Sequence, residues 1–315
     1  MSDPRFAVFG AGGVGGYFAG VLTRAGYCTA VVARGAHLEA IRRNGLRVVG
    51  PQDEFTVALA QATDDPGEIA PVDAVILAVK AWQVSEASEA VRPLLKPATK
   101  VLPLENGVEA ADQVEKLLGS EHTLIGLCRI ISAVEKPGVI RHAGLRPTVA
   151  LGEFDGSALS PSAKILMQAL ADAGMAVGTP SDMRAALWEK LLFIAALSGA
   201  GAVARATVGE LRQHPLTREL LRQLMEEVAA VAGARGVRLD ADAVSRTLAL
   251  VDTLPPSGTS SMQRDIADGK PSELEAIIGV VVRSGSESGV STPAMRYIYA
   301  SLLPQEQRAR GVSAG

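Results

Sequence analysis

The sequence predicts an α/β protein, with a doubly wound sheet of parallel strands in its N-terminal half and an all-helical C-terminal half. Short β-branched runs alternate with helical patterns over residues 5–118, as in successive β-α-β units. Several of these runs are apolar throughout, which is typical of strands covered by helices on both faces. Strand patterns nearly vanish after Pro180. We therefore expect a boundary near residues 178–181, with domains 1–179 and 180–315.

Each predicted element follows from its local pattern. Apolar, β-branched runs predict strands at residues 5–10, 28–33, 74–79 and 100–104. Amphipathic spacing predicts N-terminal helices at 14–25, 36–44, 82–91, 108–118 and 161–173. Residues 124–151 suggest short strands with turns at 136–138 and 143–147. The C-terminal helices are expected at 183–197, 211–232, 241–254, 259–267, 273–287 and 293–303.

The composition limits what the chain can bind. Its 315 residues include 31 basic and 34 acidic side chains, so the net charge of −3 suggests neither a nucleic-acid groove nor a polybasic membrane anchor. Cys28 and Cys128 lie in strand-like runs, which predicts buried thiols in a reducing compartment, by default the cytoplasm. The apolar run 191–204 is short for a bilayer span. No cluster of cysteine or histidine indicates a metal.

A glycine-rich motif follows the first predicted strand and opens the first predicted helix. In this context GxGxxG indicates a dinucleotide site of the Rossmann type. Gly10 would permit a tight turn, Gly12 would let the backbone approach a pyrophosphate, and Gly15 would let the helix pack closely on the strand. Backbone N–H groups at the helix start would face the anion. The expected cofactor contacts in this motif are Gly10, Ala11, Gly12, Gly13, Val14 and Gly15.

The residue after the second strand indicates which dinucleotide is bound. An NAD site usually has an acidic residue there, to bind the ribose hydroxyls. Here the sequence reads Ala33-Arg34-Gly35, and a guanidinium suits a 2′-phosphate. His37 is close enough in sequence to contribute. We therefore predict NADP (NADPH) as the cofactor.

Two polar segments follow the next strands, and ligands bind beyond the carboxyl ends of such strands. Lys80 follows the strand at 74–79, and Asn106 follows the strand at 100–104. Lys80 could support a cofactor phosphate or a substrate carboxylate. Asn106 could hydrogen-bond the nicotinamide ribose or the substrate. Taken alone, Lys80 could equally be a surface charge, and Asn106 before Gly107 could simply form a turn.

Seven segments, in a fixed order, resemble those of one enzyme family. They read GAGGVGGYFAG, ARGAHLEAIRRNGL, KAWQV, ENGV, PGVIRH, LWEKL and SSMQRDIADGKPSELEAIIG. From about Phe6 to about Tyr299, the chain resembles the ketopantoate reductase (2-dehydropantoate 2-reductase) family. The resemblance implies a Rossmann domain followed by an all-helical domain. It also implies NADPH-dependent reduction of 2-dehydropantoate to (R)-pantoate, a step of pantothenate biosynthesis.

The resemblance also implies a role for individual residues. Lys190 stands in the place of the family's general acid, although by itself it would be interpreted as a helix-surface charge beside Glu189. Asn106 would contact cofactor and substrate, and Lys80 would contact the cofactor. Ser261 would hold the substrate carboxylate. Glu273 would lie near the nicotinamide ribose and the lysine.

The chain departs from the family where substrate-binding asparagines are expected. Ile194 and Ser198, four and eight residues after Lys190, share its helical face, and Val208 replaces a third asparagine. A substrate hydroxyl left unpaired against Ile194 would cost about 1–3 kcal/mol. A paralogous reductase of a more apolar 2-oxo acid or carbonyl compound is therefore one alternative to the family reaction.

Two further classes are weighed against these reductases. A dehydrogenase of the hydroxyisobutyrate or 6-phosphogluconate type would have Asn or Asp where Ile194 stands, and it would lack the KAWQV segment. A non-catalytic NADPH-binding protein would tolerate loss of Lys190, Ser261 and Glu273, all of which are present. The expected partner is a small 2-oxo acid. A helical second domain is also compatible with a homodimer.

Overall fold

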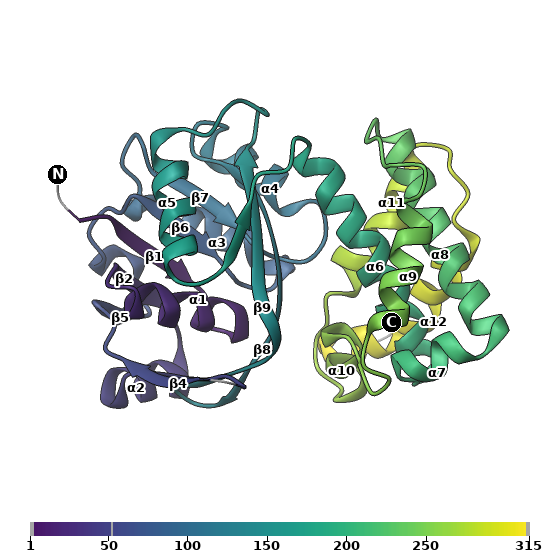
Figure 1. Ribbon diagram of the computed structural model, residues 1–315, viewed down its shortest axis with the longest axis horizontal. Helices are drawn as coiled ribbons and strands as arrows, with labels where there is room; N and C mark the ends of the chain where they lie inside the picture. The colour runs from purple at the N-terminus through teal and green to yellow at the C-terminus, as the bar shows by residue number, and fades with distance from the viewer. Residues whose placement is uncertain (1–2, 52, 313–315) are drawn as a thin grey trace. The chain divides into compact units, whose positions relative to one another are not determined.

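The computed structural model describes residues 3–51 and 53–312. The chain forms two compact units (Figure 1). The first comprises the chain through Glu105 and the segment Glu109–Met183. The second comprises Asn106–Val108 and the chain from Arg184 onward. The second unit is therefore discontinuous in sequence, because it includes three residues from the N-terminal half.

A five-stranded parallel sheet forms the centre of the first unit, in the order β5-β2-β1-β6-β7. Phe6 and Val8 face one apolar core, whereas Ala7 and Phe9 face the other. Burial on both faces explains the nearly continuous apolar runs of β1 and β6. Strand order reverses between β1 and β6, where sheets of this kind bind ligands. The bounds are β1 Arg5–Phe9, β2 Cys28–Val32, β5 Gln61–Thr63, β6 Ala74–Leu77 and β7 Lys100–Pro103.

Helices cover both faces of this sheet. The core on one face takes side chains from α1, α2 and α5, and the core on the other face takes them from α3 and α4. Ser160 shows how such helices start, because its hydroxyl accepts the Ala163 N–H and Pro161 follows it. The bounds are α1 Gly13–Arg24, α2 Gly35–Asn44, α3 Val84–Ala90, α4 Ala110–Leu118 and α5 Pro161–Asp172, with short 3-10 turns η1 Pro66–Glu68, η2 Ala81–Gln83 and η3 Arg92–Leu94.

A second, mixed sheet lies beside α1 and contains the long hairpin of β8 and β9. The predicted turn at 136–138 is present, but the predicted turn at 143–147 is wrong, since β9 continues through it. Arg129 pairs with Thr148 and Ile131 with Ala143, so residues 144–147 bulge out of the ladder without reversing the chain. The bounds are β3 Leu46–Val49, β4 Glu54–Val57, β8 Leu124–Lys136, β9 Val139–Glu153 and β10 Ala176–Gly178.

The second unit is helical in its described residues, which confirms the predicted fold class. Its first helix runs seven residues beyond the predicted end at 197. The predicted helix 211–232 is two helices, because Pro215 lacks the N–H needed to continue the first and instead starts the second. The bounds are α6 Met183–Ala204, α7 Val208–Gln213, α8 Pro215–Ala234, α9 Ala243–Thr253, α10 Ser261–Ala267, a π-helical turn η4 Glu275–Gly279, α11 Val280–Glu287 and α12 Pro293–Ala309.

Helix α6 contains the apolar run 191–204 and extends beyond it toward the N-terminus. At 22 residues it is long and apolar enough to cross one by length and composition. However, 72% of its most apolar window is buried inside the structure. The core helix of a folded domain has the same composition, because it is apolar on every side.

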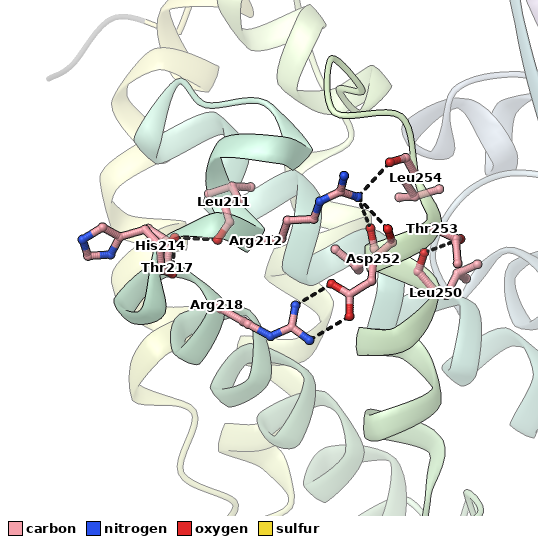
Figure 2. A network of polar contacts seen from close by, with 10 residues as sticks. Leu211, Arg212, His214, Thr217, Arg218, Leu250, Asp252, Thr253 and Leu254 are labelled. Carbon is pink, nitrogen blue, oxygen red and sulfur yellow. Dashed lines mark hydrogen bonds and ion pairs between the residues drawn. The ribbon is translucent and has the colours of Figure 1, made fainter.

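An arginine network fastens the end of α9 to α7 and α8 (Figure 2). One amino group of Arg212 donates to the carbonyls of Val251, Asp252 and Leu254, at 3.0, 2.9 and 2.8 Å. These carbonyls lie at the C-terminal end of α9, where the helix supplies few backbone donors. Arg218 adds a two-pronged pair with the Asp252 carboxylate, at 2.6 and 2.8 Å. The network therefore anchors the start of the loop that leads to α10.

Candidate active site

The glycines of the first turn meet three different surroundings. Gly10 has φ +98°, and a Cβ there would lie 2.7 Å from the carbonyl oxygen of Ala78 at the end of β6. A Cβ on Gly15 would lie 1.9 Å from the carbonyl oxygen of Gly10. In contrast, a Cβ on Gly12 would meet nothing within 4 Å. Gly10 and Gly15 therefore serve the turn and its packing, whereas Gly12 leaves its space open.

The N-terminus of α1 is suited to an anion. Its N-cap is Gly12, which offers no side-chain oxygen to the first N–H groups, and its first turn has no acidic residue. Gly13, on the next position, is packed against β8, where a Cβ would lie 2.5 Å from the carbonyl oxygen of Ser132. A pyrophosphate matches these N–H groups and the positive end of the helix dipole. These residues therefore fit the phosphates of a dinucleotide.

The end of β2 is followed by a cation, Arg34, where NAD sites usually have an acidic residue. Arg34 is the N-cap of α2, and its side chain is two-thirds exposed. It contacts Glu86 of α3 at 3.5 Å, and Glu86 is equally exposed. Such an exposed pair is worth about 0–1 kcal/mol. A phosphate dianion could therefore take the place of Glu86.

His37 has a structural contact in place of the phosphate contact suggested by its position in the sequence. Its Nδ1 accepts the Gly138 N–H at 3.0 Å, at the turn between β8 and β9. Burial lowers the pKa of His37 below its ordinary value, outweighing a backbone hydrogen bond near Ala11 that raises it. The ring is therefore neutral at physiological pH and offers no charge to a phosphate.

Lys80 begins the turn that follows β6. It is the N-cap of η2, and its backbone N–H donates to Oε1 of Gln83 at 3.2 Å. Its ammonium lies 5.9 Å from the centre of the Trp82 ring. The preceding N–H, of Val79, donates to the Glu105 carboxylate at 3.0 Å. This bond ties the end of β6 to the end of β7.

In the second unit, Asn106 and Glu273 are in direct contact. The Asn106 amide donates to Oε2 of Glu273 at 2.9 Å, although 167 positions separate them. Gly107 allows this approach, since a Cβ there would lie 2.7 Å from the carbonyl oxygen of Ala276. Glu273 is buried. A buried carboxylate needs hydrogen-bond donors to offset its lost hydration.

The helix that follows Glu273 starts with the π-helical turn η4, and such turns occur frequently at functional sites. Glu275 in this turn accepts hydrogen bonds from Tyr299 and Arg283. Burial, together with the hydrogen bond to Glu275, raises the pKa of Tyr299 to about 12. Tyr299 therefore keeps its proton and remains a donor. The turn is held by α12 on one side and meets Gly107 on the other.

Lys190 is buried in α6, with 8% of its surface exposed. This burial argues against a simple surface charge, because lysines are rarely so enclosed without a partner or a role. Ile194 is half-buried on the same face and Ser198 is buried. Val208 is also buried, at the first position of α7. The face of α6 that carries Lys190 therefore has an apolar side chain four residues later and a hydroxyl eight residues later.

Helix α10 packs on the far end of this face of α6. A Cβ on Gly201 would lie 2.6 Å from the Gln263 side chain, which donates to the carbonyl of Ala206 at 2.8 Å. Ser260 caps α10 by accepting the Gln263 N–H. Ser261 is the first residue of α10, and it is exposed. Its hydroxyl is therefore accessible to a ligand.

Sequence reasoning missed the residues that hold the segment before Glu273. Ser272 is bound by Glu306 and Arg310 of α12. The predicted helix ended at 303, before both of them, and 34 positions separate Ser272 from Glu306. No local pattern signals such a contact. Within residues 3–51 and 53–312, no group of three or more His, Cys, Asp or Glu side chains could hold a metal ion.

Comparisons with known proteins match both halves of the chain to one family. Residues 6–156 match the family described as "Ketopantoate reductase PanE/ApbA", and residues 182–306 match its C-terminal model. A 2-dehydropantoate 2-reductase of Halobacterium salinarum is 31% identical over 96% of this chain and 99% of its own. A PanE/ApbA family ketopantoate reductase from Ralstonia eutropha, 31% identical, superimposes with a TM-score of 0.87 over 97% of this chain and 99% of its own.

A D-mandelate dehydrogenase, with NADH and anilino(oxo)acetate bound, shares this fold. Its TM-score is 0.88, its identity is 23%, and the match covers 97% of this chain and 99% of its own. At this identity the likeness shows the fold alone. The fold therefore occurs in enzymes with more than one substrate.

Proposed function

Since this chain belongs to the ketopantoate reductase PanE/ApbA family of oxidoreductases, we propose that it reduces 2-dehydropantoate to (R)-pantoate with NADPH. The observation that carries the proposal is the burial of Lys190 in the unit that also holds the Asn106–Glu273 pair. A buried ammonium can stabilise the alkoxide that forms from a ketone and protonate it, and a carboxylate-bound amide can orient the ligand.

Different residues of the chain have different roles in the proposed reaction. A nicotinamide cofactor held at the glycine turn would supply the hydride for the C2 ketone. The ammonium of Lys190 stabilises negative charge on the ketone oxygen and then donates its proton to that oxygen. Asn106 and Ser261 orient the oxo acid, with Ser261 at its carboxylate. Glu273 holds the Asn106 amide at 2.9 Å, so this donor is already oriented when a ligand binds.

The test of the function is NADPH consumption with 2-dehydropantoate, beside a panel of apolar 2-oxo acids. Turnover of 2-dehydropantoate with the highest kcat/KM in the panel would support the proposal. If NADPH binds without turnover of any oxo acid, the chain is a binding protein and the proposal fails. If an apolar oxo acid is preferred, the second candidate below is favoured.

The preference for NADPH is part of the proposal and rests on Arg34. We expect Arg34→Ala to raise the KM for NADPH about 10- to 100-fold, because a charge-assisted hydrogen bond contributes about 1.5–3 kcal/mol. The KM for NADH should change less than about twofold, since NADH lacks the 2′-phosphate. Arg43→Ala is the control, because Arg43 is exposed in the last turn of the same helix. Equal effects on both cofactors would contradict the assignment.

A more apolar 2-oxo acid is the second candidate substrate. The observation that favours it is the face of α6 beyond Lys190, where Ile194 and Ser198 follow at helical spacing. Ile194 has no group to pair with a substrate hydroxyl. An apolar oxo acid would avoid that cost, which is about 1–3 kcal/mol for an unpaired polar group.

Replacing Ile194 by asparagine tests this second candidate. We expect Ile194→Asn to raise kcat/KM for 2-dehydropantoate about 5- to 100-fold relative to a branched oxo acid without the hydroxyl, because the amide pairs with the hydroxyl. Ile194→Leu should leave the ratio unchanged, since it preserves the apolar wall. A uniform change for every oxo acid would show that Ile194 does not determine specificity.

A cytoplasmic location also belongs to this proposal. Cys28 and Cys128 form no disulfide with each other, as is usual for proteins of reducing compartments. The homodimer stays a prediction, which light scattering after size-exclusion chromatography would test.

A further inference from the structure

The residue before Glu273 is bound at every polar group of its backbone and side chain. Ser272 is fully buried. Its N–H lies 3.1 and 3.0 Å from the two carboxylate oxygens of Glu306, and its hydroxyl donates to Oε2 at 2.5 Å. Its carbonyl accepts from Arg310 at 2.9 Å. A buried residue with so many bonds has one backbone orientation.

The two α12 residues that bind Ser272 also bind each other. Nε of Arg310 donates to Oε1 of Glu306 at 2.6 Å, and the two are four residues apart. Glu306 is buried, with 3% of its surface exposed. In such surroundings a charge-assisted hydrogen bond is strong and an unpaired group is costly. The carboxylate and guanidinium therefore form a rigid clamp on one peptide unit.

This clamp extends to Glu273 itself. The Ser272 hydroxyl also accepts the Leu274 N–H at 3.3 Å, so contacts of Ser272 flank Glu273 on both sides. The Glu273 carbonyl accepts the Ile277 N–H at 3.0 Å. With its backbone held in this way, the Glu273 carboxylate meets the Asn106 amide.

We propose that Glu306, with Arg310, is a positioning residue that acts through Ser272 to hold the Glu273 carboxylate against Asn106. The effect of this positioning on catalysis rests on the proposed function, whereas its effect on the Asn106–Glu273 hydrogen bond does not. Glu306 belongs to α12, and its carboxylate binds Ser272, the residue before Glu273.

A second buried glutamate in this unit provides a matched control. Glu227 of α8 is also buried, and its two oxygens accept the N–H groups of Ala294 and Met295, each at 2.8 Å. It therefore caps α12 at the opposite end from Glu306. Removing its charge should destabilise the helical unit without affecting Ser272.

The first experiment measures unfolding in urea and requires no catalysis. Trp188, buried in α6, reports on the helical unit once Trp82 is replaced by phenylalanine. We compare Glu306→Gln, Asn106→Ala and the double variant. Each substitution should raise the equilibrium constant for unfolding. If Glu306 acts through Glu273, the rise in the double variant is at least threefold smaller than the product of the two single rises, because both changes disrupt one bond. In the same cycle with Glu227→Gln in place of Glu306→Gln, the effects of the two single substitutions on the unfolding constant should simply multiply. A multiplicative cycle for Glu306 overturns the proposal.

The second experiment measures turnover of the oxo acid. We expect Glu306→Gln to lower kcat at least tenfold, and to lower it less than twofold when Glu273→Gln is already present. Glu227→Gln should lower kcat less than threefold in either background. If Glu306→Gln folds poorly, Ser272→Ala takes its place, because it removes only the hydroxyl. Its loss of kcat should likewise disappear when Glu273→Gln is already present. Equal losses in both backgrounds overturn the proposal. If the wild type reduces no oxo acid, the proposed function fails, and the unfolding cycle alone decides whether Glu306 positions Glu273.

Discussion

Replacing Lys190 by methionine is expected to lower kcat about 10²- to 10⁴-fold, the usual contribution of a general acid. Methionine fills a similar volume but has no proton to donate to the ketone oxygen. Because Lys190 is buried, no solvent-exposed cation can easily replace it. The measurement is steady-state NADPH consumption with the best oxo acid. Binding of NADPH to the variant should stay within about threefold of the wild type.

The control for Lys190 is Lys270→Met, which removes an exposed lysine that pairs with Asp268. It should leave kcat unchanged. If Lys190→Met retained more than a tenth of the wild-type kcat, Lys190 would not be the general acid. If it abolished NADPH binding as well, the loss of activity could be assigned to misfolding.

Lys100→Met is expected to destabilise the protein by about 3–5 kcal/mol, because it breaks a buried ion pair. The Lys100 ammonium lies 2.8 Å from Glu153, and both side chains are more than nine-tenths buried. It also donates to the carbonyl of Glu121 at 2.6 Å, while Glu153 accepts the Ser160 N–H at 2.9 Å. Chemical denaturation at pH 7 would measure the loss. A loss below about 1 kcal/mol would contradict the prediction.

The pH dependence of this loss has a definite sign. Burial alone would raise the pKa of Glu153, but hydrogen bonds from Lys100 and Ser160 lower it below its usual value. A lowered pKa contributes stability above the unfolded pKa, and this contribution disappears as the pH falls through the folded pKa. In Lys100→Met the burial remains without the lysine, so the pKa of Glu153 rises. The difference between wild type and variant should therefore shrink between pH 7 and pH 4.

Two further variants separate burial from charge. Lys96→Met breaks a more exposed pair with Asp73 and should cost less than about 1 kcal/mol. The double variant Lys100→Met/Glu153→Met should recover much of the loss, because two apolar side chains leave no uncompensated charge. A double variant as unstable as Lys100→Met would show that packing, and not the lone carboxylate, causes the loss.

The fold class could be predicted because it follows from the order of strands and helices, and each of these has a local pattern in the sequence. Strands β1, β2 and β6 are short, apolar and bounded by glycine or helical patterns. Strands β3, β4, β5 and β10 were missed, since their runs of three or four residues include exposed or half-buried positions and lack the continuous burial of β6. Their place is decided by partners, such as Gly138–Arg141 beside β3.

Glycine and proline misled the prediction in β9. Gly144 has φ +90°, and Pro147 follows three residues later, a pattern typical of a turn. The neighbouring strand β8 supplies partners on both sides of this segment. The chain therefore resumes the ladder, and the local signal marks a bulge.

In the candidate site, too, features that are contiguous in sequence could be predicted, whereas contacts between distant segments could not. The glycine turn could be predicted residue by residue, because its chemistry is contiguous in sequence, and the open space at Gly12 agrees with its expected role. The contact of Asn106 with Glu273, and the clamp of Glu306 and Arg310 on Ser272, join distant segments. Such contacts depend on how helices pack, which no local pattern records.

The assignment of Asn106–Val108 to the second unit limits how this protein could be divided or recombined. A fragment beginning at Arg184 would carry Lys190 and Glu273, but it would lack the amide that Glu273 accepts and the glycine that fits against Ala276. A chimaera that exchanges the helical unit between two relatives would need to exchange residues 106–108 as well. The two units are therefore not separable modules of one gene, and a working swap requires three junctions in place of one.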